Sequence, residues 1–301
     1  KRTFYNWYHR WSEHGEAGLE PRRRTRIQWN SIPQDLKNLA VEVALDAPEL
    51  SSREVATKIV DDYQLFISES SVCRILKSRG LIEQSEHRFM MASDEFKDKT
   101  RFVNQMWQTD FTYFKIIGWG WYYLSTVLDD YSRYIVHWEL CSNMKNTDAQ
   151  RSVMEAMRKS GLSKANPPKL LSDNGSCYIS GELKSFLEDN YNIEQIHGRP
   201  LHPQTQGKIE RYHRSMKNVV KLNNYYSPSE LECAISDWVE HYNNSRYHES
   251  LNNLTPADVY FGRGEEILAT RAKIKQESLK IRKQNYYLYT NSKSKTVKLD
   301  W

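Results

Sequence analysis

Apolar residues between positions 33 and 82 recur at the three- and four-residue spacing of amphipathic helices. The pattern predicts a short helix over 36–43, a second that begins at Ser51, three residues before Glu54, and a third over 68–80. The outer face of the third helix carries the bases Arg74, Lys77 and Arg79. Two short helices with a tight connection, the second basic outside, predict a helix-turn-helix DNA-binding domain. A small helical packing module is the alternative.

The pattern changes at Trp107, where aromatic and β-branched residues become dense. Three strands of an antiparallel meander are predicted at 107–115, 121–128 and 134–141. Helices are predicted at 146–160, 181–190, 205–222 and 229–244, with short strands at 169–172 and 193–197. Antiparallel strands followed by alternating helices and strands predict an α/β layered domain.

Composition excludes two classes of protein. No apolar run approaches the roughly 18 residues of a membrane helix, and the hydrophobic share of 39% with 12% aromatic residues argues against disorder. The net charge of +5 is mild, but it is unevenly placed. Basic segments of +4, +5 and +6 lie at 1–30, 199–221 and 261–301. They suggest a polyanion bound along defined tracks, with solvated surface charge as the alternative.

The N-terminal segment resembles the end of a longer structure. An amphipathic aromatic helix is expected before Gly15, followed by a basic linker with Arg22, Arg23 and Arg24 that could lie on phosphates. The chain starts with Lys1 rather than Met, so we expect a missing or processed start. It carries no N-terminal signal stretch and no CxxC pair, so we expect a cytoplasmic protein with reduced thiols and no zinc module.

Two aspartates occupy positions that are unusual for acids. Asp110 interrupts an otherwise apolar strand, where an unpartnered carboxylate is costly to bury. Asp173 follows the short strand 169–172, and ligand groups converge at strand ends in α/β sheets. Taken singly, each could equally be a turn-forming or capping residue.

Glu210 lies among bases on its predicted helix. At about 100° per residue, a core stripe is formed by Ile209, Tyr212, Met216, Val219 and Val220. Glu210 lies on a separate face with Arg214, Lys217 and Lys221. A salt-bridged surface helix is possible, but one acid cannot balance three cations. A phosphate backbone along this face, with a metal ion held by Glu210, would account for all four.

Four strings resemble the catalytic (OrfB-type) subunit of insertion-sequence transposases, in the DDE transposase and retroviral-integrase-like superfamily. They are WQTDFTYFKIIGWGWYYLSTVLDDYSRY, LLSDNGS, HPQTQGKIERYHRSMK and HYNNSRYHESLNNLTPADVYFG. The resemblance implies an RNase H-like integrase core, a mixed sheet flanked by helices, with Asp110, Asp173 and Glu210 as the catalytic and metal-binding triad. The stretch between the last two is one residue longer than usual, which we assign to the loop before Gln204. Asp129 and Asp130 are interpreted as strand-end and turn residues.

The same resemblance implies further roles. Gln206, Arg214 and Lys217 match integrase positions that contact donor DNA ends. Lys208, which lies in the same motif, and Lys221, on the same helix face as Glu210, are also expected to contact DNA. Three carboxylates without Cys or His ligands suit Mg²⁺ or Mn²⁺, and two ions per site are expected. Water would cleave the element's end, and the exposed 3′-hydroxyl would attack another phosphodiester. A catalytically silent DNA-binding regulator and an RNase H-like nuclease without strand transfer are the alternatives.

The expected organisation places these functions on separate segments. Boundaries are predicted at 1–31 (end of an N-terminal helix-turn-helix segment plus basic linker), 32–92 (helix-turn-helix domain), 93–106 (linker), 107–262 (catalytic core) and 263–301 (basic C-terminal tail). Expected partners are terminal inverted repeats, target DNA, further copies of the chain, and an upstream helix-turn-helix subunit or fused segment. No membrane partner is expected. The expected location is the bacterial cytoplasm, associated with the nucleoid.

Overall fold

The computed structural model describes residues 2–19, 28–82, 100–197 and 206–296. The chain divides into two compact units, Lys1–Ile82 with Arg271–Trp301, and Glu83–Thr270. The finer boundaries at 1–31, 32–92, 93–106, 107–262 and 263–301 stay predictions. Within the described ranges, no helix combines the length and apolar character needed to span a bilayer.

The first unit contains the three predicted helices. They are α2 (Gln34–Asp46), α3 (Ser52–Tyr63) and α4 (Glu69–Ser78), preceded along the chain by α1 (Arg2–His14) and the 3-10 turn η1 (Gly15–Leu19). Ser51 and Glu54 form the predicted capping box at the start of α3. The three helices bury one apolar cluster, which includes Leu36, Ile59 and Val72. Periodicity therefore located these three helices correctly.

The basic C-terminal segment contains a helix that the sequence pattern did not indicate. Helix α10 runs from Gly264 to Thr296. Its apolar side chains lie on separate sides, with Ile274 and Ile281 on one and Leu279 and Tyr286 on another. Without a single apolar stripe, the amphipathic signal is lost.

Helix α10 supplies polar contacts to the last turn of α3 and to the connection between α3 and α4. Arg271 pairs with Asp61 at 2.6 Å between Nη2 and Oδ2. The backbone N–H of Phe66 donates to Ser278 Oγ at 3.1 Å, and Arg282 donates to the Phe66 carbonyl. Residues 271–282 are therefore an integral part of the first unit.

The second unit is built on a mixed five-stranded sheet in the order β3-β2-β1-β4-β5. The strands are β1 (Met106–Ile116), β2 (Gly120–Asp129), β3 (Ile135–Cys141), β4 (Lys169–Ser172) and β5 (Gln195–His197). β1, β2 and β3 pair antiparallel, whereas β1–β4 and β4–β5 pair in parallel. This confirms the predicted meander and the α/β mixed-sheet class.

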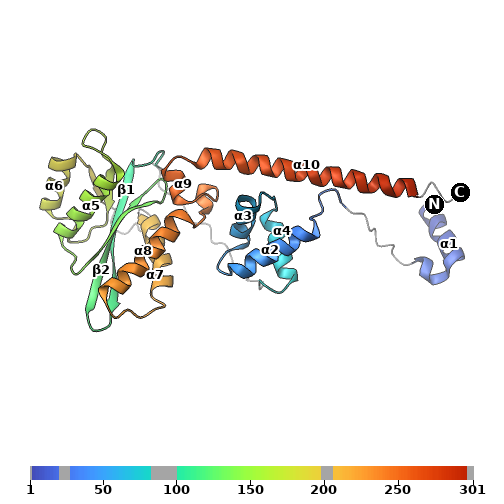
Figure 1. Ribbon diagram of the computed structural model, residues 1–301, viewed down its shortest axis with the longest axis horizontal. Coiled ribbons are helices and arrows are strands. Elements are labelled where there is room, and N and C mark those ends of the chain that lie inside the picture. Colours follow the sequence, from blue (N-terminus) through green and yellow to red (C-terminus); the bar gives the residue numbers. More distant parts are fainter. Residues whose placement is uncertain (1, 20–27, 83–99, 198–205, 297–301) are drawn as a thin grey trace. The chain divides into compact units, whose positions relative to one another are not determined.

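Helices cover both faces of the sheet (Figure 1). They are α5 (Asn146–Ser160), α6 (Gly181–Tyr191), α7 (Gly207–Val220) and α8 (Pro228–Asn244), followed by η3 (Glu249–Leu251) and α9 (Pro256–Tyr260). One apolar cluster packs α5 and α6 against Trp107 and Val127. The other packs α7 and α8 against Phe114 and Leu128. The predicted core stripe of α7 is correct except at Val219, which is 49% exposed.

The buried His137 on β3 is expected to make the fold less stable at acidic pH. The residue is 8% exposed, and neither ring nitrogen has a hydrogen-bond partner. Burial, reinforced by Lys159 and Arg158 on α5 and opposed by Glu155, lowers its pKa from 6.5 to about 4. The unfolded chain therefore binds this proton at higher pH than the folded chain. The contribution of the neutral His137 ring to the free energy of unfolding is therefore fully present above about pH 6.5 and is lost as the pH falls towards 4.

We expect His137→Leu to remove about 2–3 kcal/mol of the stability loss between pH 7 and pH 4.5. Urea unfolding at both pH values measures the difference. His14→Leu, at an exposed histidine of α1, serves as the control and should behave like the parent chain. Equal acid sensitivity in His137→Leu and the parent chain would contradict the assignment.

Candidate active site

Two of the predicted acids meet where β1 and β4 lie side by side. Asp110 is in the middle of β1, and Asp173 follows the last residue of β4. In the parallel register, Gln108 pairs with Leu171. Asp110 and Asp173 each follow two residues later, so the continued register brings them to the same level. Burial raises the pKa of Asp173, the Gly175 N–H opposes this, and the charge of Asp110 adds to it. The two carboxylates therefore lie close enough to repel each other.

The turn after β4 fixes the side chain of Asp173. Its Oδ1 accepts the backbone N–H of Gly175 at 2.9 Å. A Cβ at position 175 would lie 2.8 Å from that oxygen, so any other residue there would displace the Asp173 carboxylate. Asp173 is thus a turn residue, as one reading of the sequence suggested, and its carboxylate is oriented by the turn.

His213 holds the carboxylate of Asp110 from the other side. It is 5% exposed and lies on α7, one turn after Glu210. Its Nδ1 is 3.3 Å from Asp110 Oδ2, and its Nε2 is 3.3 Å from Thr126 Oγ1. Thr126 is the partner of Asp110 in the β1–β2 register. The imidazole therefore ties α7 to the strand pair at the level of Asp110.

Asp110 and Glu210 line the same groove, which has a volume of about 770 Å³. Glu210 is exposed in the first turn of α7. Asp173 is not among the residues that line this groove. Across the described ranges, no three His, Cys, Asp or Glu side chains are arranged to hold a metal ion. The loop before Gln204, to which the extra residue was assigned, lies outside the described residues.

The wall of the groove carries the predicted row of cations. Arg214, Lys217 and Lys221 line it together with Tyr113. The ammonium groups of Lys217 and Lys221 lie 4.7 and 5.8 Å from the centre of the Tyr113 ring. Burial and the neighbouring Lys221 lower the pKa of Lys217, with Asp110 opposing. Among the described residues, Arg214 forms no ion pair with Glu210, so the face is not a salt-bridged pair.

Two predicted DNA contacts are instead turned inward. Lys208 donates through Nζ to Asp130 Oδ2 at 2.6 Å and to the Asp130 carbonyl at 2.9 Å. Burial lowers the pKa of Lys208, although Asp130 partly offsets this. Gln206 is 7% exposed. Their predicted contact with DNA stays a prediction, and Lys208 would have to leave Asp130 to make it.

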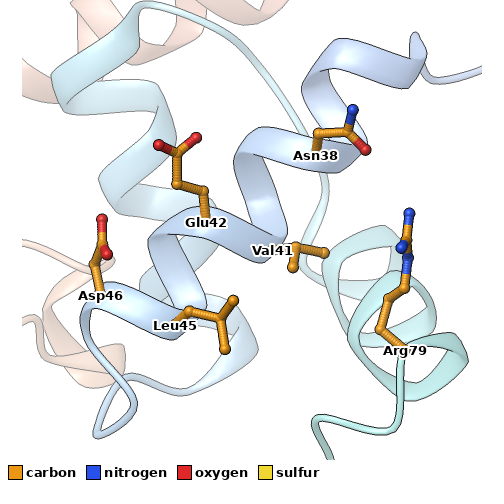
Figure 2. Close-up of a pocket in the computed structure, with 6 residues that line it drawn as sticks. All are labelled: Asn38, Val41, Glu42, Leu45, Asp46 and Arg79. Carbon is orange, nitrogen blue, oxygen red and sulfur yellow. The ribbon is translucent and has the colours of Figure 1, made fainter.

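The basic residues of α4 are exposed, as expected of the outer face of a recognition helix. Arg74 donates to the Ser70 carbonyl and to Ser71 Oγ of its own helix. Arg79 borders a hollow of about 260 Å³ beside Glu42 and other residues of α2 (Figure 2). Lys77 lies in the last turn of α4, and Arg79 is the C-cap residue of that helix. Arg22, Arg23 and Arg24 lie outside the described residues.

Sequence reasoning missed the residues that support the acids. The spacing of three residues between Glu210 and His213 could have indicated His213, because residues at this spacing are neighbours on the helix surface. Asp130 and Lys208 gave no joint signal, because their contact spans 78 positions. Pairs of this kind follow from the tertiary fold rather than from local pattern.

Comparison with known families identifies the second unit. Two families, both described as "Integrase core domain", match residues 101–203 and 191–256. A third, described as "Homeodomain-like domain", matches residues 3–76. The integrase-core matches together include all three predicted catalytic acids.

Individual relatives agree with these families. The transposase for insertion sequence element IS629 of Shigella sonnei is 29% identical over 160 residues, 52% of this chain and 51% of that protein. The transposase InsK for IS150 of Escherichia coli is described as putative; it is 28% identical over 52% of this chain and 54% of its own length. The chain thus spans about half the length of these transposases.

A retroviral integrase core is among the similar solved structures. The HTLV-2 integrase catalytic core in complex with magnesium shares 20% identity over 53% of this chain and 97% of its own, with a TM-score of 0.43. The family matches and the bacterial relatives carry the assignment. They show an integrase core domain over residues 101–256, with insertion-sequence transposases among the relatives of the chain.

Proposed function

We propose that the chain is a DDE transposase that cleaves the DNA ends of an insertion sequence and joins the exposed 3′-hydroxyl to another phosphodiester. The observation that carries the proposal is the groove that holds Asp110 and Glu210 beside Arg214, Lys217 and Lys221. Phosphates attract cations, and phosphoryl transfer needs carboxylates that hold metal ions. This groove offers both on neighbouring surfaces.

The donor set fits a hard divalent cation. Burial and, to a smaller extent, the charge of Asp110 raise the pKa of Asp173, and a cation between the two carboxylates would relieve both the burial cost and the repulsion. We propose that these two acids and Glu210 hold Mg²⁺ or Mn²⁺, two ions per site. Bound metal would activate the attacking oxygen and stabilise the leaving one.

The protein's own side chains have separate roles in this proposal. His213 keeps the carboxylate of Asp110 in place through its contact at 3.3 Å. Arg214, Lys217 and Lys221 bind the phosphate backbone that crosses the groove. These contacts position DNA without reading its sequence.

The first unit would supply the sequence preference. We propose that α4 reads the terminal inverted repeats in a major groove, and that the basic segment with Arg22, Arg23 and Arg24 lies on phosphates. Two ends must be brought together for transposition, so a homo-oligomer is proposed. An upstream helix-turn-helix subunit or fused segment remains part of this proposal.

The test is a joining assay with the full chain in Mg²⁺. Duplexes that carry the inverted repeats flanking the gene are incubated with a supercoiled plasmid, and joined products are separated from nicked ones. Joined products that depend on the repeat sequence are expected. Nicking without joining would identify a nuclease, and binding without either reaction would identify a DNA-binding regulator; each would contradict the proposal.

A second prediction concerns sequence preference. Arg74→Ala and Arg79→Ala should weaken binding to the element's ends by about 1–3 kcal/mol each and bind other sequences almost unchanged, because base contacts specify. Competition binding with end and scrambled duplexes measures the ratio. Lys58→Ala, at an exposed base of α3 that pairs with Asp62, is the control. Equal weakening on all sequences would show that the two arginines contact phosphates only.

A further inference from the structure

We infer that Gln108, Asp130 and Lys208 form a clasp that positions Glu210 against Asp110. The three residues are positioning residues, because they act through the first turn of α7 rather than on DNA. The inference rests on the proposed function, since it assigns a purpose to the placement of two proposed metal ligands. It also reassigns Lys208 from a DNA contact to a support within the protein.

Gln108 connects β1 directly to the start of α7. It is 1% exposed and precedes Asp110 by two residues on β1, so both side chains leave the same face of the strand. Its Oε1 accepts the backbone N–H of Ile209 at 3.1 Å. Its Nε2 donates to Asp130 Oδ1 at 2.7 Å. One amide side chain therefore reaches the residue immediately before Glu210.

The bond to Ile209 replaces a normal helix cap. The first backbone N–H groups of a helix have no partner within the helix, and the N-cap side chain usually satisfies one at the third position. In α7 the N-cap residue is Gln206, and its side chain makes no capping bond. Ile209 is the third residue of the helix, and Gln108 on β1 binds its N–H instead. The start of α7 is thereby registered to the strand that carries Asp110.

Lys208 and Asp130 complete the clasp from the end of β2. The Asp130 side chain is 4% exposed, and its Oδ2 accepts Lys208 Nζ at 2.6 Å. Thr100 Oγ1 donates to the same oxygen at 2.6 Å. The Lys208 side chain is 33% exposed, but Asp130 is buried, and removing the partner of a buried charge is destabilising. Lys208 also lies in the first turn of α7, so the pair restrains the segment that carries Glu210.

Contacts with the strands restrain α7 both before and after Glu210. The clasp holds the residues before it, Lys208 and Ile209, to β1 and β2. His213, after it, contacts Asp110 at 3.3 Å. Glu210 itself is exposed in the groove. A side chain that is free in the groove, on a backbone fixed on both sides, can meet a metal ion with little rearrangement.

The test uses Gln108→Met, Lys208→Met and Lys208→Arg in the full chain. The two methionine variants keep side-chain volume and remove the polar contacts. They should slow joining about tenfold to a hundredfold and raise the Mg²⁺ concentration for half-maximal rate several-fold, with affinity for DNA ends changed less than about twofold. Lys208→Arg retains the cation and should recover most of the rate.

Ser132→Ala is the matched control. Ser132 donates its backbone N–H and its hydroxyl to Asp129 Oδ2 in the turn next to Asp130, and among the described residues its hydrogen bonds do not reach α7. It should lower the thermal midpoint without changing the Mg²⁺ requirement. If the methionine variants lose activity only in proportion to their loss of thermal stability, with the Mg²⁺ requirement unchanged, the clasp is merely structural and the inference is overturned.

Amide hydrogen exchange separates this inference from the proposed function. In Gln108→Met, amides 207–211 should exchange faster by about tenfold or more, while amides 212–220 stay unchanged. This readout needs no activity. If the parent chain neither cleaves nor joins DNA, the proposed function fails. Amide exchange and the affinity of the chain for Mn²⁺ would still test whether the clasp positions Glu210. Unchanged exchange at 207–211 overturns the clasp whatever the activity.

Discussion

Asp110→Asn is expected to reduce both cleavage and joining by about a thousandfold or more, while affinity for DNA ends stays within about twofold. Asparagine keeps the shape of the side chain and an acceptor for His213, but it lacks the negative charge that holds a divalent cation. A carboxylate that binds metal supplies several kcal/mol to the transition state. Rate assays in Mg²⁺, with a parallel binding assay, measure both effects.

The two other acids should behave in the same way. Asp173→Asn and Glu210→Gln are predicted to lose cleavage and joining together. Asp189→Asn, an exposed change on α6 across the sheet, removes an equal charge and should leave both reactions intact. Joining retained by any of the three active-site variants would remove that residue from the proposed triad.

Replacing Arg214, Lys217 and Lys221 together by alanine is expected to give the second largest effect. DNA affinity should fall about a hundredfold at low salt, on the order of 1 kcal/mol for each lost phosphate contact. The slope of log affinity against log salt should become shallower by about 2 to 3, because fewer counterions are released. Binding titrations at several salt concentrations measure both quantities.

A charge-matched control distinguishes a binding row from general surface charge. Arg158, Lys159 and Lys184 lie on α5 and α6, away from the groove residues. Replacing these three by alanine lowers the net charge by the same amount and should shift the salt slope little. Equal weakening by the two triple variants would contradict a DNA track along α7.

Local pattern was sufficient for most of the fold. The change of period at Trp107 located the meander, and the Ser51–Glu54 spacing located the start of α3. Both signals work because each residue's neighbours in sequence are also its neighbours in the element. Helix α10 was missed because its apolar residues are divided between separate sides, and its contacts with Asp61 and Phe66 span more than 200 positions.

In the site, too, local pattern could predict some features and not others. Its acids could be selected from sequence, because charge within an apolar strand and charge at a strand end are both visible. Their mutual placement could not, because it depends on the parallel register between β1 and β4. Nor did the sequence indicate the partner of Lys208, because Asp130 lies 78 positions away and only the fold brings the two together.

The most direct test of the account is the location of Mn²⁺ in crystals of the full chain bound to a DNA end, found from its anomalous scattering. Anomalous peaks are expected within ligand distance of Asp110, Asp173 and Glu210, and they should be lost in Asp110→Asn crystals. Peaks bound by other side chains, or unchanged peaks in Asp110→Asn, would contradict the claim that these three acids hold the catalytic metal.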